Sequence, residues 1–274
     1  MDTRGTIRSI FGTRRALIGV IHVGALPGAP GSRESVDTIA KAAAADARAY
    51  REAGFSGLMV ENMHDRPYLR REVGPEVVAT MTVVAHAVRR EVPDLPLGIQ
   101  VLAGANRESI AIAHATGARF VRVEGFVFAH VADEGLMQSD AGTLLRYRRQ
   151  LGAEAVAVFA DIKKKHSAHA MTADMDIAET ARAAEFFLAD GVIVTGPTTG
   201  EPASPEEVRD VAQAVRVPVL VGSGVTPANL ARFPTAHGFI VGSSVKEGGV
   251  WCNPLDRNAV RALVGAFAGL GREQ

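Results

Sequence analysis

One short stretch of the sequence gathers side chains that could do chemistry directly behind an apolar run. Residues 160–170 read A-D-I-K-K-K-H-S-A-H-A, and they follow A-V-A-V-F at 155–159. An apolar run of this length is typical of a buried strand. The acid, the lysines and the histidines would then stand where the strand opens into a loop, which favours a reaction site over a solvated bend.

The order of the charged residues in this stretch predicts how they face. Side chains alternate across a strand, so Asp161, Lys163 and Lys165 are expected on one face and Lys164, solvated, on the other. Amines beside a carboxylate suit general acid–base catalysis or electrostatic stabilisation of an enolate-like intermediate. Schiff-base chemistry would require a lysine whose pKa is depressed by burial or by a neighbouring cation. His166 completes this predicted catalytic group.

Seven other apolar runs resemble the one before Asp161, and their composition predicts the fold. The eight runs are Ala16–His22, Gly57–Asn62, Leu97–Leu102, Phe120–Glu124, Ala155–Asp161, Gly191–Thr195, Pro218–Gly222 and Gly238–Gly242. Most are nearly continuous Val, Ile and Leu, which is typical of parallel strands buried on both faces.

Helical segments with one apolar face separate these runs. They are Ser35–Gly54, Pro75–Glu91, Arg107–Thr116, Asp140–Leu151, Ile177–Ala189, Pro205–Val215, Thr226–Arg232 and Asp256–Leu270. Eight strand–helix units in 274 residues predict one (β/α)₈ TIM barrel domain over residues 1–274, with 1–14 as an N-terminal extension that covers one end. A doubly wound sheet is disfavoured because no G-x-G-x-x-G turn follows the first run.

In such a barrel the functional side chains lie at the carboxyl ends of the strands. The predicted catalytic residues are therefore Glu61, Glu124, Asp161, Lys163, Lys165 and His166, and the predicted substrate-binding residues include His22, Asn62, Gln100, Thr195 and Ser244. Glu61, Glu124 and Asp161 could also hold Mg²⁺ through oxygen ligands, so the sequence leaves a divalent cation open. His22 is a single histidine, which disfavours the paired-histidine metal hydrolases.

Two glycine-containing turns predict a phosphate site. V-G-S-G-V-T-P at 221–227 follows the seventh run and V-G-S-S at 241–244 follows the eighth. The loops after these two strands commonly bind phosphate in TIM barrels, because glycine lets main-chain N–H groups approach the ligand. The expected phosphate ligands are Gly222, Ser223, Gly224, Gly242 and Ser243.

Composition excludes several classes of partner. The 30 basic and 30 acidic residues cancel, so no electrostatic feature favours nucleic acid. The single Cys252 fits a reducing, cytoplasmic location, and we expect no transmembrane segment. The Arg14–Arg15 pair superficially matches an export signal, but the following run contains His22 and lacks a cleavage site. A homo-oligomer stays open.

Several stretches resemble the BtpA/SgcQ family. They are I-G-V-I-H-V-G-A-L-P-G-A-P (18–30), M-V-E-N (59–62), F-A-D-I-K-K-K-H (159–166), D-G-V-I-V-T-G (190–196), L-V-G-S-G-V (220–225) and G-F-I-V-G-S-S-V-K-E-G-G (238–249). The resemblance covers residues 12–270 and implies a TIM barrel of the phosphate-binding kind. One departure is L-A-G-A-N at 102–106, where the family pattern implies a charged turn, so the specificity of this chain is expected to differ.

These features lead to two functional hypotheses. The first is an enzyme that acts on a small phosphorylated, sugar-derived metabolite, as an isomerase, an epimerase or an aldolase/lyase, with 124–135 as a candidate lid. The second, which the family name implies, is a non-catalytic factor in photosystem I or membrane-complex accumulation. Such a factor needs an exposed apolar surface, for which Phe126 and Phe128 are the candidates.

Overall fold

The structure is a computed structural model that describes residues 3–196, 198 and 200–270. Within these residues, eight parallel strands close into a barrel in the order β1-β11-β10-β9-β7-β4-β3-β2. The strands are β1 (Ala16–His22), β2 (Gly57–Glu61), β3 (Leu97–Gln100), β4 (Phe120–Val123), β7 (Ala157–Ile162), β9 (Gly191–Val194), β10 (Val219–Val221) and β11 (Gly238–Val241). All eight predicted runs are strands of this barrel, so the predicted (β/α)₈ fold is confirmed.

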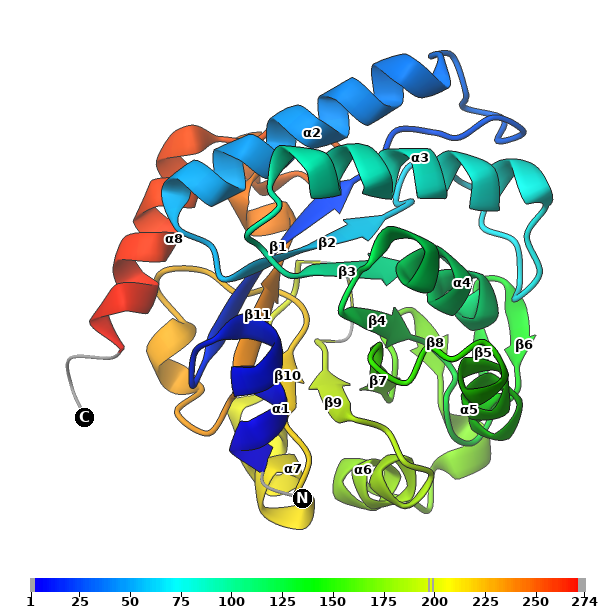
Figure 1. Cartoon of the computed structure of the whole chain (residues 1–274). Coiled ribbons are helices and arrows are strands. Elements are labelled where there is room, and N and C mark those ends of the chain that lie inside the picture. The colour runs from blue at the N-terminus through cyan, green and yellow to red at the C-terminus, as the bar shows by residue number, and fades with distance from the viewer. Residues whose placement is uncertain (1–2, 197, 199, 271–274) are drawn as a thin grey trace.

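The helices surround the ring of strands (Figure 1). They are α1 (Thr3–Phe11), α2 (Val36–Ala53), α3 (Pro75–Glu91), α4 (Asn106–Thr116), α5 (Ala141–Gln150), α6 (Ile177–Phe186), α7 (Pro205–Ala214) and α8 (Arg257–Gly269). Short 3₁₀ turns at Ala170–Thr172, Leu230–Arg232, Ser243–Val245 and Glu247–Gly249 complete the list. None of the described helices combines the length and apolarity that crossing a membrane requires.

Local capping explains where several helices begin and end. Ser35 and Ser204 accept hydrogen bonds from the main-chain N–H groups of Thr38 and Glu207, and Pro205 stands at the first position of α7. Gly54 ends α2 with φ 96°, a left-handed conformation that glycine adopts without a Cβ clash. These caps lie at the ends of the helical segments predicted at Ser35–Gly54 and Pro205–Val215.

The helix predicted at Thr226–Arg232 is wrong, because only the 3₁₀ turn Leu230–Arg232 forms. The Asn229 side chain accepts a hydrogen bond from the Thr226 N–H (2.8 Å) and donates one to the Gly224 carbonyl (2.7 Å). Side-chain bonds of this kind offer the main chain an alternative to a helix. They hold the loop after β10 in an open turn.

The amino-terminal end of the barrel is closed by apolar packing. Ile7, Ile10 and Phe11 of α1 are buried and cover this end. The Phe11 ring lies 5.4 Å from that of Phe120, which in turn lies 5.5 Å from Phe159. This aromatic layer is a floor that leaves only the opposite end of the barrel available for polar groups.

A small antiparallel sheet stands over the barrel between β4 and α6. It consists of β5 (His130–Ala132), β6 (Gly135–Met137) and β8 (Ser167–Ala168), in the order β6-β5-β8. The candidate lid is therefore a hairpin paired with the loop after β7, not an irregular loop. Phe126 is fully buried beneath it and Phe128 is half-buried, so the predicted apolar surface at these two residues is wrong.

Gly98 should be essential for the aromatic layer. A Cβ at Gly98 would lie 2.1 Å from Cε2 of Phe120, so Gly98→Ala must displace a buried ring. We expect a loss of about 1–3 kcal/mol in the free energy of unfolding, measured by chemical denaturation. Gly265→Ala on exposed α8, where no atom lies within 4 Å, should instead raise stability by up to about 1 kcal/mol. Equal stability of Gly98→Ala and the wild type would contradict this packing.

Candidate active site

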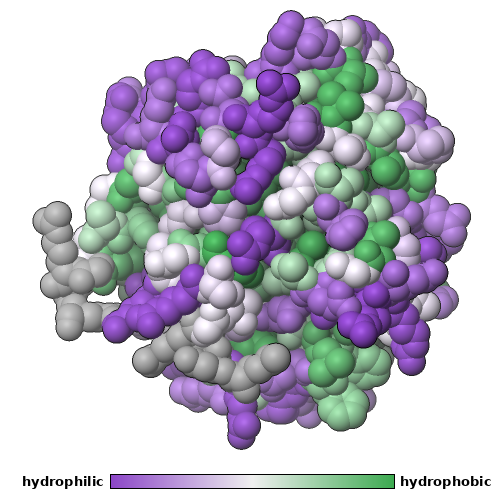
Figure 2. Space-filling model, in the orientation of Figure 1, coloured by the Kyte–Doolittle hydropathy of each residue, from purple (hydrophilic) through white to green (hydrophobic). Residues whose placement is uncertain are grey.

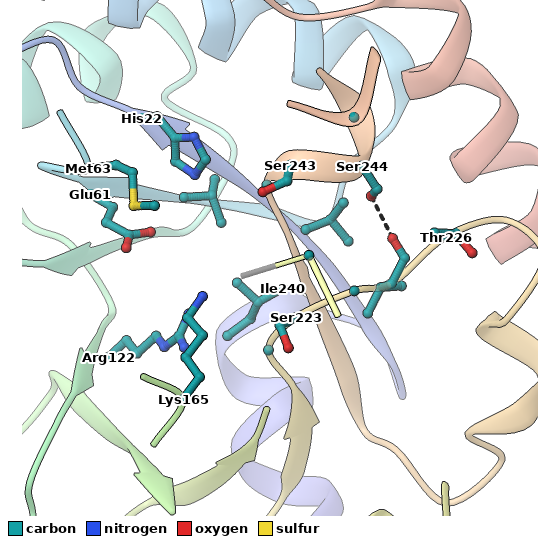
Figure 3. Close-up of a pocket in the computed structure, with 18 residues that line it drawn as sticks. His22, Glu61, Met63, Arg122, Lys165, Ser223, Thr226, Ile240, Ser243 and Ser244 are labelled. Carbon is teal, nitrogen blue, oxygen red and sulfur yellow. Dashed lines mark hydrogen bonds between the residues drawn. The ribbon is translucent and has the colours of Figure 1, made fainter. Parts of the chain in front are cut away.

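A cavity of about 290 Å³ opens at the carboxyl ends of the barrel strands. Its lining includes many of the predicted residues: His22, Glu61, Lys165, Gly222, Ser223, Gly224, Gly242, Ser243 and Ser244. The sequence stretches that supply them lie far apart and are brought together by closure of the barrel. Figure 3 shows the ionisable side chains on one side of the cavity and the serines, with Thr226, on the other.

Arg122 also lines the cavity, and sequence reasoning missed it. It stands in the middle of β4, within F-V-R-V, and only 5% of its side chain is exposed. A charged residue inside a run that is otherwise apolar was the available signal, because a buried charge needs a partner.

That partner is Asp161. The Arg122 Nε lies 3.1 Å from Asp161 Oδ2 and 3.2 Å from Oδ1, and 1% of the Asp161 side chain is exposed. The Asp161 charge raises the pKa of Arg122, although burial opposes this, so the guanidinium stays charged. Asp161 does not line the cavity. It orients the arginine that does.

The prediction that Lys164 is solvated is wrong. Lys164 is buried, with its Nζ 3.2 Å from Glu124 Oε2 and 3.6 Å from Glu134 Oε2. The physical reason is the main chain of Lys163, whose φ of 45° ends the extended conformation, so strand alternation does not continue past Ile162. Glu124 is thereby engaged in a second ionic cluster beside the cavity and does not line it.

Lys163 and His166 also lie off the cavity wall. Lys163 Nζ donates a hydrogen bond of 2.5 Å to the Met175 carbonyl and borders a smaller cavity beneath the hairpin, together with His130. His166 is exposed, with φ 53°. Of the residues predicted from the loop after β7, the structure brings only Lys165 into the cavity.

The predicted binding residues Asn62, Gln100 and Thr195 are buried behind the lining. Asn62 Oδ1 accepts a hydrogen bond from the Leu102 N–H (2.7 Å), and Gln100 Nε2 donates one to Glu124 Oε1 (3.3 Å). Thr195 Oγ1 has no hydrogen-bond partner within the described ranges. Asn62 and Gln100 therefore position loops and neighbouring side chains.

His22 is held as a neutral imidazole. Its Nδ1 donates a 2.9 Å hydrogen bond to the Trp251 carbonyl, which leaves Nε2 as the acceptor that faces the cavity. Burial lowers the pKa of His22 to about 4, and this outweighs the hydrogen bond that favours the charged form. A Cβ at Gly242 would lie 2.8 Å from this Nε2, so the glycine makes room for the ring.

Burial disfavours the charged forms of two side chains in the cavity, Glu61 and Lys165. Burial raises the pKa of Glu61, against the opposing charges of Arg122 and Lys165. Burial lowers the pKa of Lys165, and the charge of Arg122 lowers it further. Both shifts favour the neutral form of the group. Each shift moves the pKa of its side chain towards neutral pH, which suits a group that transfers protons.

The opposite side of the cavity presents main-chain donors. Among the described residues, the N–H groups of Ser223, Gly224, Val225, Ser243 and Ser244 form no hydrogen bonds, and all five residues line the cavity. We call these five N–H groups the cradle. Successive main-chain N–H groups in turns form concavities that bind anions. The cradle can therefore hold an anionic group without a lysine or arginine of its own.

The hydroxyl groups of Ser223 and Ser244 form hydrogen bonds with main-chain groups of the surrounding loops. Ser223 Oγ accepts a hydrogen bond from the Gly196 N–H (2.7 Å) and donates one to the Glu201 carbonyl (2.9 Å). Ser244 Oγ donates to the Val225 carbonyl at 2.5 Å and joins the two turns. Gly224 has φ 60°, and a Cβ there would lie 2.2 Å from the nitrogen of Pro202. Only a glycine fits this close approach.

The carboxylates do not fit the magnesium site that the sequence left open. Asp161 is paired with Arg122 and Glu124 with Lys164, so neither is available to a cation beside Glu61. In the part of the chain that the structure describes, no group of three or more His, Cys, Asp or Glu side chains could hold a metal ion. We derive no catalytic step through a metal.

Comparison with known proteins identifies relatives of this chain. The sequence profile of the BtpA family matches residues 13–269. An uncharacterized mitochondrial protein of Caenorhabditis elegans is 46% identical over 95% of this chain and 96% of its own length. The photosystem I biogenesis protein BtpA of Synechocystis is 34% identical over 94% of this chain and 90% of its own length.

Solved structures show the same fold at low identity. (S)-3-O-geranylgeranylglyceryl phosphate synthase from Thermoplasma acidophilum, in complex with its substrate sn-glycerol-1-phosphate, superposes with a TM-score of 0.60 at 17% identity. The superposition covers 97% of this chain and 98% of the synthase. At this identity the likeness concerns the fold alone.

Removing Arg122 should lower the stability of the protein, because Asp161 would be left buried and unpaired. We expect Arg122→Met to lower the free energy of unfolding at pH 7 by about 3–5 kcal/mol, because a buried carboxylate loses its compensating charge. Adding Asp161→Asn should recover most of that loss. Chemical denaturation of both single variants and the double variant measures the coupling. A double variant no more stable than Arg122→Met alone would disprove the pairing.

His22 should make stability depend on pH. With a folded pKa of about 4 and an ordinary value of 6.5, the unfolded chain binds the proton first, so His22 destabilises the fold as pH falls through this window. The unfolding free energy of the wild type should fall by about 3 kcal/mol relative to that of His22→Asn from pH 7 to pH 4. Urea titrations followed by circular dichroism at several pH values measure it. A pH-independent difference would show that the imidazole titrates normally.

Proposed function

The chain belongs to the BtpA family, and from this premise we propose that it is an enzyme that acts on a small phosphorylated, sugar-derived metabolite by acid–base chemistry at the barrel mouth. The observation that carries the proposal is the cradle: its five residues line a cavity with ionisable side chains on the other side, and their N–H groups have no hydrogen-bond partner among the described residues. One end of the cavity suits an anion and the other suits proton transfer.

The phosphate would be bound by the cradle. Its N–H groups come from the turns after β10 and β11, which is where TIM barrels commonly hold phosphate. The solved synthase that shares the fold is in complex with a phosphorylated substrate, sn-glycerol-1-phosphate. Binding energy from the non-reacting phosphate would then orient the reacting carbon atoms against the ionisable groups.

The reacting groups would be Glu61 and Lys165, with Arg122 stabilising negative charge that develops on the substrate. A buried carboxyl group with a raised pKa can donate and recover a proton, and a guanidinium held by Asp161 is oriented before the substrate arrives. His22 would accept a hydrogen bond from a substrate hydroxyl through Nε2. These roles suit an isomerase, an epimerase or an aldolase/lyase.

The cavity volume limits the size of the substrate. A volume of about 290 Å³ lies at the lower end of the range for small-molecule sites. It suits a phosphorylated compound of a few carbon atoms.

The cytoplasmic location expected from the sequence stays a prediction, and the name of the worm relative describes that protein as mitochondrial.

One observation favours a second candidate function, a role in the accumulation of a protein complex such as the one that the name of the Synechocystis relative indicates for that protein. Phe186, Phe187 and Leu188 at the end of α6 are exposed by 82%, 48% and 69%. Apolar surface appears over α6 in Figure 2. Exposed apolar residues in a group are typical of a protein-binding surface. This group, and not Phe126 or Phe128, would bind the partner.

Phosphate binding can be tested without knowledge of the reaction. Inorganic phosphate and dihydroxyacetone phosphate should raise the thermal unfolding midpoint, since a ligand at 100 times its dissociation constant stabilises by about 2.7 kcal/mol. Ser243→Asp places a carboxylate beside the cradle and should abolish the shift by charge repulsion. Ser9→Asp, exposed on α1 at the closed end of the barrel, is the matched control and should keep it. If neither ligand shifts the wild-type midpoint, the phosphate site does not exist.

A further inference from the structure

We infer that Lys165 forms a covalent imine with the carbonyl carbon of a short-chain aldehyde phosphate or ketone phosphate. The inference rests on the proposed function and deepens it, because it names the class of substrate and the atom that bonds to it. The three consecutive lysines Lys163, Lys164 and Lys165 have different surroundings, and the first reason follows from this difference.

The first reason is that only Lys165 presents its amine to the cavity. Lys163 is engaged by the Met175 carbonyl, and Lys164 by Glu124 and Glu134. Lys165 Nζ has no hydrogen bond or ion pair with any of the described residues, and Figure 3 shows it pointing into the cavity. An amine without a partner there is available to a ligand.

The second reason is that burial and the charge of Arg122 outweigh the attraction of the nearby acids for the Lys165 ammonium. Asp161, four residues earlier in the chain, is held by Arg122, whose own guanidinium borders the same cavity. A lysine that is desolvated and lies beside another cation loses part of its preference for the ammonium form, and the neutral amine is the nucleophile in imine formation. The direction of its pKa agrees with this geometry.

The third reason is a proton donor within the same cavity. Glu61 is 8% exposed, lines the cavity with Lys165, and its carboxyl oxygens accept no hydrogen bond from the described residues. Burial raises its pKa and so favours the protonated acid. Imine formation needs an acid at this point, because the carbonyl oxygen must leave as water.

The step balances with these two side chains alone. The Lys165 nitrogen attacks the carbonyl carbon, one amine proton moves to the carbonyl oxygen, and a carbinolamine forms. Glu61 then donates its proton to that hydroxyl group, the carbon–oxygen bond breaks, and water leaves. The products are a protonated imine on Lys165, a Glu61 carboxylate and one water molecule, with charge conserved.

The position of the cradle restricts the substrate. The cradle lies across the cavity from Lys165 (Figure 3), so a phosphate bound there would lie opposite this amine. The carbonyl group must therefore be separated from the phosphate by a short carbon chain that a cavity of about 290 Å³ can contain. Unphosphorylated carbonyl compounds lack the anchor and should react slowly.

Borohydride trapping tests the inference. The full chain is incubated with dihydroxyacetone phosphate or glycolaldehyde phosphate at neutral pH, sodium borohydride is added, and peptides are mapped by mass spectrometry. We expect a stable adduct on Lys165 with at least one probe, at least tenfold faster than with dihydroxyacetone or glycolaldehyde. Lys165→Met should lose the adduct, and Lys41→Met, a substitution of an exposed lysine on α2, should keep it.

The outcomes separate this inference from the proposed function. If both phosphorylated probes raise the unfolding midpoint but neither leaves an adduct on Lys165, the imine is overturned while the phosphate site stands. An adduct that forms equally fast without a phosphate group, or equally on Lys41, also overturns it. If neither probe stabilises or modifies the protein, the proposed function fails as well. A folded Lys165→Met, verified by circular dichroism, is required for the comparison.

Discussion

The ion pair between Arg122 and Asp161 determines the electrostatics of the cavity. Both side chains are almost completely buried, so each is tolerated only because the other compensates it. Arg122 therefore pairs with Asp161, the acid that the sequence predicts on the same face as Lys163 and Lys165. As a result, a fixed positive charge borders the cavity near the amine of Lys165, which forms no ion pair with a described carboxylate.

A second ionic cluster, formed by Lys164, Glu124 and Glu134, lies beside the cavity and does not line it. Lys164 joins Glu124, at the end of β4, to Glu134 on the hairpin between β5 and β6. The hairpin also pairs with β8, so the loops after β4 and β7 are connected by both hydrogen bonds and charge. This cluster supports the wall of the cavity, and Glu61 is the carboxylic acid among the described residues that line the cavity.

The cavity is polar in two different ways, and the difference suits a ligand with two different ends. The cradle offers dipoles of main-chain N–H groups, which cannot transfer a proton at neutral pH and bind an anion without reacting. The other end offers Glu61, Lys165, Arg122 and a neutral His22. An inert anchor opposite reactive groups is the arrangement in which binding energy can be used for orientation.

The sequence by itself determined the architecture, because the signals for it are local. Continuous Val, Ile and Leu runs marked the barrel strands, and segments with one apolar face between them marked the helices. These features depend on residues a few positions apart. Their order along the chain was sufficient for the (β/α)₈ barrel.

Only the tertiary structure decided which polar groups face the cavity. Arg122 was hidden inside a strand, and its role follows from Asp161, 39 residues away. Strand alternation assigned Lys163 to the cavity, but the left-handed main chain at Lys163 ends that alternation and turns Lys164 inward towards Glu134. Burial, charge pairing and the direction of a side chain after a strand ends all depend on neighbours that are distant in sequence, so no local pattern contains them.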